Sequence, residues 1–234
     1  MEMKDKPRIL IACEFSGTVR EAFARLKWDA WSCDLLPTER PGQHIQGDVL
    51  EVLDEGWDLM IAHPPCTYLC SSGLHWNKRI EGRAEKTEEA LEFVQALLDA
   101  PIEHIALENP VGCISTRIRK YHQKIQPYEF GHDASKGTCL WLKYLPLLEP
   151  TEYVAPRLGC KKCKAKFGML VDDKCPACGN AEGPFKKVWG NQTATGQNSL
   201  GPSEDRWAKR SETYPGIAKA MAQQWSRFIE ACRR

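Results

Sequence analysis

No stretch of the sequence reaches the ~18–20 consecutive apolar residues that a membrane-spanning helix needs. Residues 1–5 lack the apolar region of a secretory signal peptide, and the chain contains neither an internal repeat nor a low-complexity tract. Hydrophobic residues make up 42% of the chain and charged residues 27%, which is typical of globular proteins and unlike disordered or fibrous ones. We therefore expect a globular, cytoplasmic protein with no membrane partner.

The chain also has almost no excess charge, with 32 Lys and Arg against 31 Asp and Glu. This balance excludes the chain-wide basic field by which histone-like proteins bind nucleic acid. The basic residues nevertheless gather in three stretches, at 78–86, 117–124 and 161–166. A single stretch of this kind is usually a solvated face, but the three together leave nucleic acid open as a partner.

At 234 residues the chain is long for one small module and short for two full domains, so we expect one catalytic-size core with an appendage. Short apolar strand patterns alternate with helical patterns along its first half, at 8–13, 18–26, 30–33, 58–62, 87–98 and 102–107. This alternation predicts a mostly parallel sheet with helices on both faces. Such sheets bind ligands at the carboxyl ends of their strands, where the polar motifs of this chain fall.

Eleven cysteines occur without a secretion signal, so we expect thiols, metal ligands or a nucleophile instead of disulfides. Four of them form two CxxC pairs, Cys160 with Cys163 and Cys175 with Cys178. Two such pairs can close a tetrahedron of thiolates around Zn²⁺, and with all four positions filled by protein the site would be structural. Zinc would let a segment too small for its own core fold. Chance turns or a redox dithiol are the alternatives.

Cys66 follows two prolines at the end of the strand expected at 58–62, and Glu108 follows the strand expected at 102–107. Prolines hold the backbone rigid, which suits a nucleophile, although a small buried apolar residue is the commoner fate of cysteine. A thiol and an acid in one cleft suit attack on a pyrimidine. Sulfur would add to C6 and the acid would steady N3, which leaves C5 nucleophilic towards an electrophilic methyl group.

A third set of polar residues follows the first strands. Phe15-Ser16-Gly17 forms a glycine turn before a helix, which allows a ligand to approach the backbone. Asp34, one strand later, could accept hydrogen bonds from ribose hydroxyls, and Asp48 could meet an adenine amino group. Each signal is weak alone, and their order and spacing are what indicate a cofactor site.

Together these motifs resemble the cytosine-5 DNA methyltransferase family, in particular its compact phage and prophage members. The resemblance covers roughly residues 8–150 and 205–230, and its most specific part is Pro65-Cys66 with Glu108-Asn109. It implies S-adenosylmethionine held by the residues that match the family's cofactor motifs: Phe15, Ser16, Gly17, Asp34, Gly47, Asp48 and also Pro64. The segment 213–218 looks like the family's last motif, a helix that returns to the cofactor pocket.

The resemblance implies an α/β, Rossmann-like methyltransferase fold with a small zinc-ribbon insertion. Residues 1–150 would form the catalytic domain, 151–204 a zinc-ribbon or target-recognition region, and 205–234 a C-terminal helix packed on the catalytic domain. The protein would transfer methyl to C5 of cytosine in double-stranded DNA through a covalent Cys66 adduct, with Glu108 gripping the base. We expect a monomer or weak dimer, in a bacterial host cell if the chain is encoded by a phage or prophage.

The sequence departs from the family pattern at several places. Pro110 replaces the usual valine, and His63-Pro64 stands where the family has Gly-Phe. The Gln-x-Arg-x-Arg motif is missing, so Arg117, Arg119 or Lys136 would have to supply its positive charge. These departures leave open the alternative that the chain has the methyltransferase fold but has lost the enzyme's activity.

The loop after Cys66 carries an aromatic residue and cations that we expect to close over the target strand, with Trp76 near the gap and Lys78, Arg79 and Arg83 on phosphates. A plain surface loop is the alternative.

Three other functions remain open from the sequence. Enzymes that methylate exocyclic amines (N4 of cytosine or N6 of adenine) carry an aromatic after Pro-Pro, where this chain has Cys66 and then Tyr68. A non-catalytic zinc-ribbon DNA-binding protein is the second. An enzyme acting on RNA or on a free nucleotide is the third, since the net charge is close to neutral.

Overall fold

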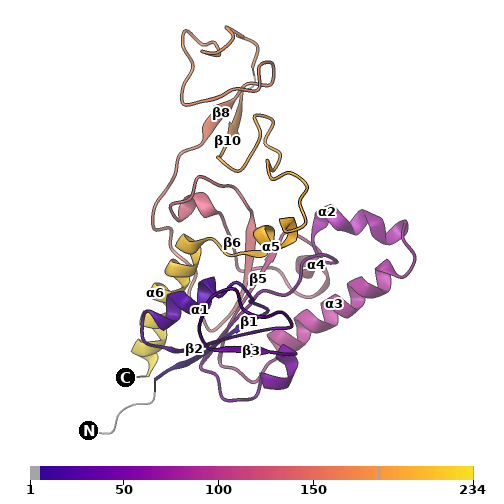
Figure 1. The fold of residues 1–234 in the computed structure, drawn as a ribbon, viewed down its shortest axis with the longest axis vertical. Helices are drawn as coiled ribbons and strands as arrows, with labels where there is room; N and C mark the ends of the chain where they lie inside the picture. The colour runs from indigo at the N-terminus through magenta and orange to yellow at the C-terminus, as the bar shows by residue number, and fades with distance from the viewer. Residues whose placement is uncertain (1–5, 184, 234) are drawn as a thin grey trace. The chain divides into compact units, whose positions relative to one another are not determined.

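A computed structural model describes residues 6–183 and 185–233 (Figure 1). These residues form two compact units. The first comprises 6–125, 137–149 and 217–233, and the second comprises 126–136 and 150–216 without residue 184. The contacts thus group residues 126–136 with the segment that contains the cysteine pairs. The boundary near residue 204, between the expected zinc-ribbon region and the expected C-terminal helix segment, stays a prediction.

The first unit is built on a seven-stranded sheet of order β3-β2-β1-β4-β5-β7-β6. Neighbours among β1 to β5 run parallel, whereas β7 is antiparallel to β5 and β6. This is the order of a doubly wound nucleotide-binding sheet with one antiparallel strand inserted before the last. The expected Rossmann-like α/β fold is confirmed. The strands are β1 (Arg8–Ala12), β2 (Asp29–Asp34), β3 (His44–Gln46), β4 (Leu59–Ala62), β5 (His104–Pro110), β6 (Gln123–Ile125) and β7 (Thr138–Lys143).

Helices cover both faces of this sheet because its central strands are apolar on both sides. Residues such as Leu10 and Met60 join a buried cluster with α3 (Arg83–Leu98) and the short helix η1 (Val49–Val52). Their neighbours in sequence, such as Ile9 and Ile61, are equally buried and point to the opposite face. The apolar stripes of α1 (Thr18–Ala24) and α6 (Pro215–Cys232) are buried outside that cluster, and the two helices lie near each other in Figure 1.

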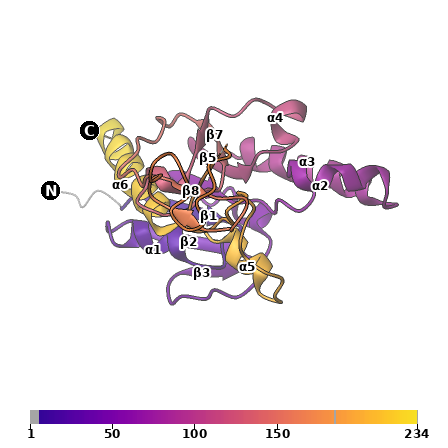
Figure 2. The ribbon, with the colours of Figure 1, turned by 90° about the horizontal axis from the view of Figure 1, so that it is seen from above.

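An arm of short helices precedes α3. It consists of α2 (Ser71–Leu74) and η2 (His75–Lys78), and with the first turns of α3 it extends beyond the sheet, as Figure 2 shows. One more short helix, α4 (Ile114–Arg117), follows β5. None of the helices in the described residues is both long and apolar enough to cross a membrane.

The second unit has little regular structure. Its three-stranded antiparallel sheet has the order β10-β8-β9, built from β8 (Arg157–Gly159), β9 (Lys166–Phe167) and β10 (Lys186–Val188). Two short helices, η3 (Pro127–Glu129) and α5 (Arg206–Ser211), complete it. Polar contacts connect its segments: Asp133 accepts a hydrogen bond from the Gly190 N–H at 2.6 Å and pairs with Arg157.

The loops that follow β4 and β5 are joined by backbone hydrogen bonds. The Cys113 N–H donates to the Leu69 carbonyl at 2.9 Å, and the Ser71 N–H donates to the Val111 carbonyl at 3.0 Å. Gly112 permits this close approach, because a Cβ at that position would lie 1.9 Å from the Leu69 oxygen. The segment that carries Cys66 is therefore tied to the end of β5.

We predict that Gly112→Ala lowers the free energy of unfolding by roughly 1–3 kcal/mol, since the added methyl must push the Leu69 carbonyl away. Urea denaturation followed by circular dichroism measures the change. Gly201→Ala is the matched control, because a Cβ at Gly201 meets nothing within 4 Å. Equal losses in the two variants would contradict the packing argument.

Candidate active site

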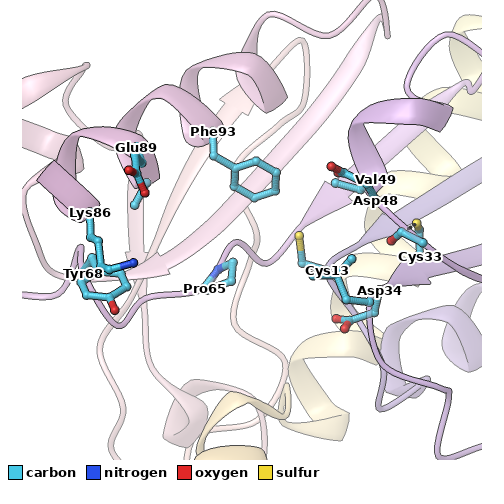
Figure 3. A pocket seen from close by; sticks show the side chains of 13 residues that line it. Cys13, Cys33, Asp34, Asp48, Val49, Pro65, Tyr68, Lys86, Glu89 and Phe93 are labelled. Carbon is cyan, nitrogen blue, oxygen red and sulfur yellow. Dashed lines mark hydrogen bonds between the residues drawn. The ribbon is translucent and has the colours of Figure 1, made fainter.

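A pocket of about 370 Å³ lies at the carboxyl ends of β1 and β2 and faces α3 (Figure 3). Asp34 and Asp48, both expected to hold a cofactor, line one side of it together with Cys13 and Cys33. The other side comes from α3 and from the loop after β4, with Pro65, Tyr68, Lys86, Glu89 and Phe93. The pocket therefore runs from the expected cofactor residues to the proline turn that carries Cys66.

The two aspartates are held by nearby backbone amides. Asp34 ends β2 and accepts from the Leu36 N–H at 2.9 Å, and burial raises the pKa of its carboxyl. Asp48 accepts from the Leu50 N–H at 3.0 Å and so caps η1. The lining thus has three carboxylates, those of Asp34, Asp48 and Glu89, and one cation, Lys86. The pocket suits a ligand that carries positive charge and polar hydrogens.

Two thiols in the pocket were not expected from the sequence. Burial raises the pKa of Cys33 to about 11, and burial with the charge of Asp34 raises the pKa of Cys13 still further. Both side chains are therefore neutral at neutral pH and act as small apolar lining. Their position directly after β1 and within the last residues of β2 is the signal that could have indicated them.

The glycine turn lies before α1, with Gly17 in the left-handed conformation at φ 71° as the N-cap. Ser16 and Gly17 are buried, and Phe15 is half-buried. The Glu14 carboxylate accepts from the Val19 N–H at 2.7 Å and the Arg20 N–H at 3.2 Å. The first amides of α1, which hold phosphate in dinucleotide-binding sheets, are thus occupied by a carboxylate of the protein.

A buried arginine organises the loop that follows Asp34. Arg20 is 2% exposed, and its guanidinium donates to the Arg40 carbonyl at 2.6 Å, to Ser32 Oγ at 2.8 Å and to Thr38 Oγ1 at 3.1 Å. A Cβ at Gly17 would lie 2.6 Å from this guanidinium, which explains the glycine there. Sequence reasoning missed Arg20, because nothing in a helical pattern marks a cation as buried.

Cys66 lies in the loop after β4, and Glu108 lies in the last part of β5, the parallel neighbour of β4. In the β4–β5 register Ala62 is paired with Leu107, so the next residues, His63 and Glu108, lie side by side. His63 Nδ1 is 3.0 Å from Glu108 Oε2. The structure brings the turn that carries Cys66 and the Glu108 carboxyl to the same edge of the sheet.

Asn109 holds the proline turn in place. It is buried, and its Nδ2 donates to the Pro64 carbonyl at 2.8 Å. Of the two prolines, Pro65 lines the pocket, whereas Pro64 is buried and is not part of the lining. The Cys66 carbonyl accepts from the N–H groups of Leu69 and Cys70 at 3.1 and 3.0 Å, which closes a turn around the half-buried thiol residue.

The expected nucleic-acid residues fall into two groups. Trp76, Lys78 and Arg79 are exposed on the arm. Arg83 instead lies 4.8 Å from the centre of the Tyr68 ring and donates to the Thr67 carbonyl at 3.0 Å, so it braces the loop after Cys66.

The four cysteines of the second unit converge, and their metal-ligating sulfur atoms all lie within 4.8 Å of one another. The Cys160 and Cys178 sulfurs are 3.9 Å apart, and the Cys163 and Cys175 sulfurs are 3.7 Å apart. A tetrahedron of thiolates around Zn²⁺ with bonds of ~2.3 Å has an edge of about 3.8 Å. The described residues therefore fit a zinc ion at this position.

The two CxxC turns have the same backbone pattern. In the first, the Lys164 N–H donates to the Cys160 carbonyl, and in the second the Gly179 N–H donates to the Cys175 carbonyl, at 2.9 and 2.8 Å. Both residues that follow the second cysteine have positive φ, 64° at Lys164 and 67° at Gly179. The two turns are thus equivalent, as expected for the two halves of a metal knuckle.

No protein-family description and no curated protein matches this chain. Among solved structures it is similar to a candidate DNA modification methyltransferase encoded within a prophage in E. coli, at 12% identity and TM-score 0.41, over 64% of this chain and 52% of that one. It is also similar to the Entamoeba histolytica methyltransferase EhMeth, at 14% identity and TM-score 0.44, over 65% and 59%. The chain thus spans little more than half of each, and at these TM-scores neither likeness bears on its activity.

We predict that iodoacetamide at pH 8 alkylates Cys13 and Cys33 at least roughly tenfold more slowly than the exposed Cys232, because the thiolate is the reactive form. Their raised pKa values keep both thiols protonated at pH 8 in the folded protein. Peptide mass spectrometry over time measures the rates. In urea the difference should disappear, and equal rates in the native protein would contradict the burial of these thiols.

Proposed function

We propose that this chain is a DNA methyltransferase that transfers a methyl group from S-adenosylmethionine to C5 of cytosine through a covalent adduct with Cys66. The observation that carries the proposal is the position of the Cys66 turn and Glu108 at adjoining carboxyl ends of β4 and β5. The same turn contributes Pro65 to the wall of an acidic pocket at the ends of β1 and β2. The residues that we propose as nucleophile and acid therefore lie at the same edge of the sheet as the proposed cofactor pocket.

The pocket supports S-adenosylmethionine over a dinucleotide. Its volume falls in the ~300–1,000 Å³ range of small-molecule sites. Glu14 fills the phosphate-binding amides of α1, which disfavours a pyrophosphate, and the carboxylates of Asp34 and Asp48 favour a cationic ligand. Asp34 would accept from the ribose hydroxyls and Asp48 from the adenine amino group. Bound there, S-adenosylmethionine would supply an electrophilic methyl group.

The protein's part in the reaction falls to two side chains. The cytosine would leave the duplex, since C6 cannot be reached inside the base stack. The Cys66 thiolate would form a bond to C6 while Glu108 hydrogen bonds to N3, so that electron density reaches C5 and C5 accepts the methyl group. A base then removes the C5 proton and the C6–sulfur bond breaks, which returns Cys66 as the thiolate.

Exposed groups on each unit, taken separately, support double-stranded DNA as the partner. On the arm, Lys78 and Arg79 would contact phosphates, and Trp76 would lie near the gap left by the extruded base. In the second unit several exposed lysines surround the cysteine turns, at 161, 162, 164, 174, 186 and 187. We propose that this unit contributes to target recognition and that Zn²⁺ on its four cysteines gives it a structural centre.

Amino methylation is the second candidate, and the residues after Pro-Pro disfavour it. In that chemistry an aromatic ring after Pro-Pro stacks on the base. The Tyr68 ring is instead contacted by Arg83 at 4.8 Å and Lys86 at 5.9 Å. Two cations of the protein thus contact the Tyr68 ring. The residue directly after Pro-Pro, where that chemistry has its aromatic ring, is Cys66.

We predict that wild-type protein with mixed DNA and methyl-labelled cofactor yields labelled 5-methylcytosine after digestion to nucleosides, and that Cys66→Ala abolishes the product. The variant should bind S-adenosylmethionine within roughly threefold of wild type in calorimetry, since Cys66 does not hold the cofactor. Its loss of activity should be at least roughly 10³-fold, because the covalent step has no substitute.

Two controls sharpen this experiment. Cys70→Ala, four residues along the same loop, should keep most of the activity. A duplex with 5-fluorocytosine should trap wild type covalently but not Cys66→Ala. Full activity of Cys66→Ala removes Cys66 from the mechanism, label on an exocyclic amine shows amino methylation, and absence of cofactor binding in wild type shows a non-catalytic protein.

We predict one Zn²⁺ per chain by native mass spectrometry, and loss of this ion in Cys163→Ser together with Cys178→Ser. These two cysteines are exposed, whereas Cys160 and Cys175 are buried, so the pair can be replaced with little damage to packing. Cys232→Ser, which removes an exposed thiol elsewhere, should keep the metal. A metal-free wild type purified without chelator would contradict a zinc site.

A further inference from the structure

The carboxyl group of Glu108 is held by a neighbouring histidine. His63 Nδ1 lies 3.0 Å from Glu108 Oε2, and the two side chains are only 9% and 12% exposed. The residues are 45 positions apart and meet because β4 and β5 pair in parallel. This contact pairs the acid of the proposed function with a group that can both donate and accept a proton.

The other ring nitrogen of His63 has an unusual environment. Among the residues that the structure describes, His63 Nε2 is buried and has no hydrogen-bond partner. Asn109 Oδ1, on the residue after Glu108, is in the same state. Within the described residues, the hydrogen bond to Glu108 is therefore the polar contact of the His63 ring.

Two of the three cations expected from the sequence have contacts elsewhere. Arg117 forms two hydrogen bonds with Glu88 on the exposed side of α3, at 3.0 and 2.7 Å. Lys136 belongs to the second unit, where its Nζ donates to the Arg210 carbonyl at 2.8 Å. His63 contacts the Glu108 carboxyl at the position where the sequence departs from the family pattern.

We propose that His63 is the positioning residue of Glu108, an inference that rests on the proposed function. His63 Nδ1 fixes Oε2, so that the other carboxyl oxygen is directed to N3 of the extruded cytosine. When the Cys66 sulfur bonds to C6, the carboxyl proton moves from Glu108 to N3, and the resulting carboxylate keeps a hydrogen bond from His63. The proton returns to Glu108 when the C6–sulfur bond breaks, so the pair ends as it began.

Two substitutions separate hydrogen bonding from packing. His63→Phe keeps a ring of similar shape but removes the hydrogen bond, whereas His63→Asn keeps an amide donor at the position of Nδ1 but reduces the volume. We expect His63→Phe to lower kcat for 5-methylcytosine formation by roughly 10–100-fold, with KM for DNA and cofactor within about threefold, because the loss falls on proton transfer. His63→Asn should recover to within roughly fivefold of wild type.

A matched control comes from the same strand. His104, at the start of β5, is also buried and also has an unpartnered ring nitrogen among the described residues, but it lies at the opposite end of the strand. His104→Phe should leave kcat within about twofold of wild type. Thermal denaturation and cofactor calorimetry of all variants report whether a loss of activity is only a loss of folding.

A double-mutant cycle with Glu108→Gln tests whether His63 acts through the glutamate. If it does, adding His63→Phe to Glu108→Gln should change single-turnover rates by less than about threefold, because the partner is already lost. Equal losses from His63→Phe in both backgrounds, activity of His63→Phe equal to wild type, or better recovery by His63→Phe than by His63→Asn would each overturn the assignment to His63. A wild type that forms no 5-methylcytosine would overturn the proposed function itself.

Discussion

Parallel pairing of β4 with β5 is the constraint on which the rest of the candidate site depends. Because Ala62 is paired with Leu107, the residues that follow them leave the sheet side by side, and His63 reaches Glu108. One residue further, Asn109 donates to the Pro64 carbonyl and holds the turn before Cys66. A register shift of one residue would move each of these side chains to the other face of the sheet.

The edge of the sheet that carries Asp34 and Asp48 depends on a second set of buried polar groups. Glu14 accepts hydrogen bonds from the amides at the start of α1, and Arg20 from that same helix donates to the loop after β2. Each is a charged group kept within the fold by several hydrogen bonds, which offset the loss of hydration. Asp34 and Asp48 then face the pocket as carboxylates, together with Glu89 from α3. Because Glu14 and Arg20 already have hydrogen-bond partners within the protein, a ligand in the pocket meets the other charged groups.

The second unit is organised by different forces. Its strands are two or three residues long, and turns with positive φ at Lys164 and Gly179 shape its cysteine pairs. Strands this short bury little apolar surface, so they contribute little stability by themselves. Its four sulfurs converge as the ligands of a metal site do, and a metal bound there would stabilise a unit with so small an apolar core. The candidate site, by contrast, belongs to a unit with a large apolar interior.

The sequence by itself determined the α/β alternation, the position of each motif after a strand, and the spacing of the cysteine pairs, because all of these are local patterns. Only the tertiary structure decided that Glu108 meets His63, that Arg20 is buried, that Arg83 braces a loop, and that Cys13 and Cys33 line the pocket. These contacts depend on strand register and side-chain direction, which bring together residues far apart in the chain. Local composition does not encode them, since an arginine on a helix or a histidine after a strand has the same sequence signature whether it is buried or solvated.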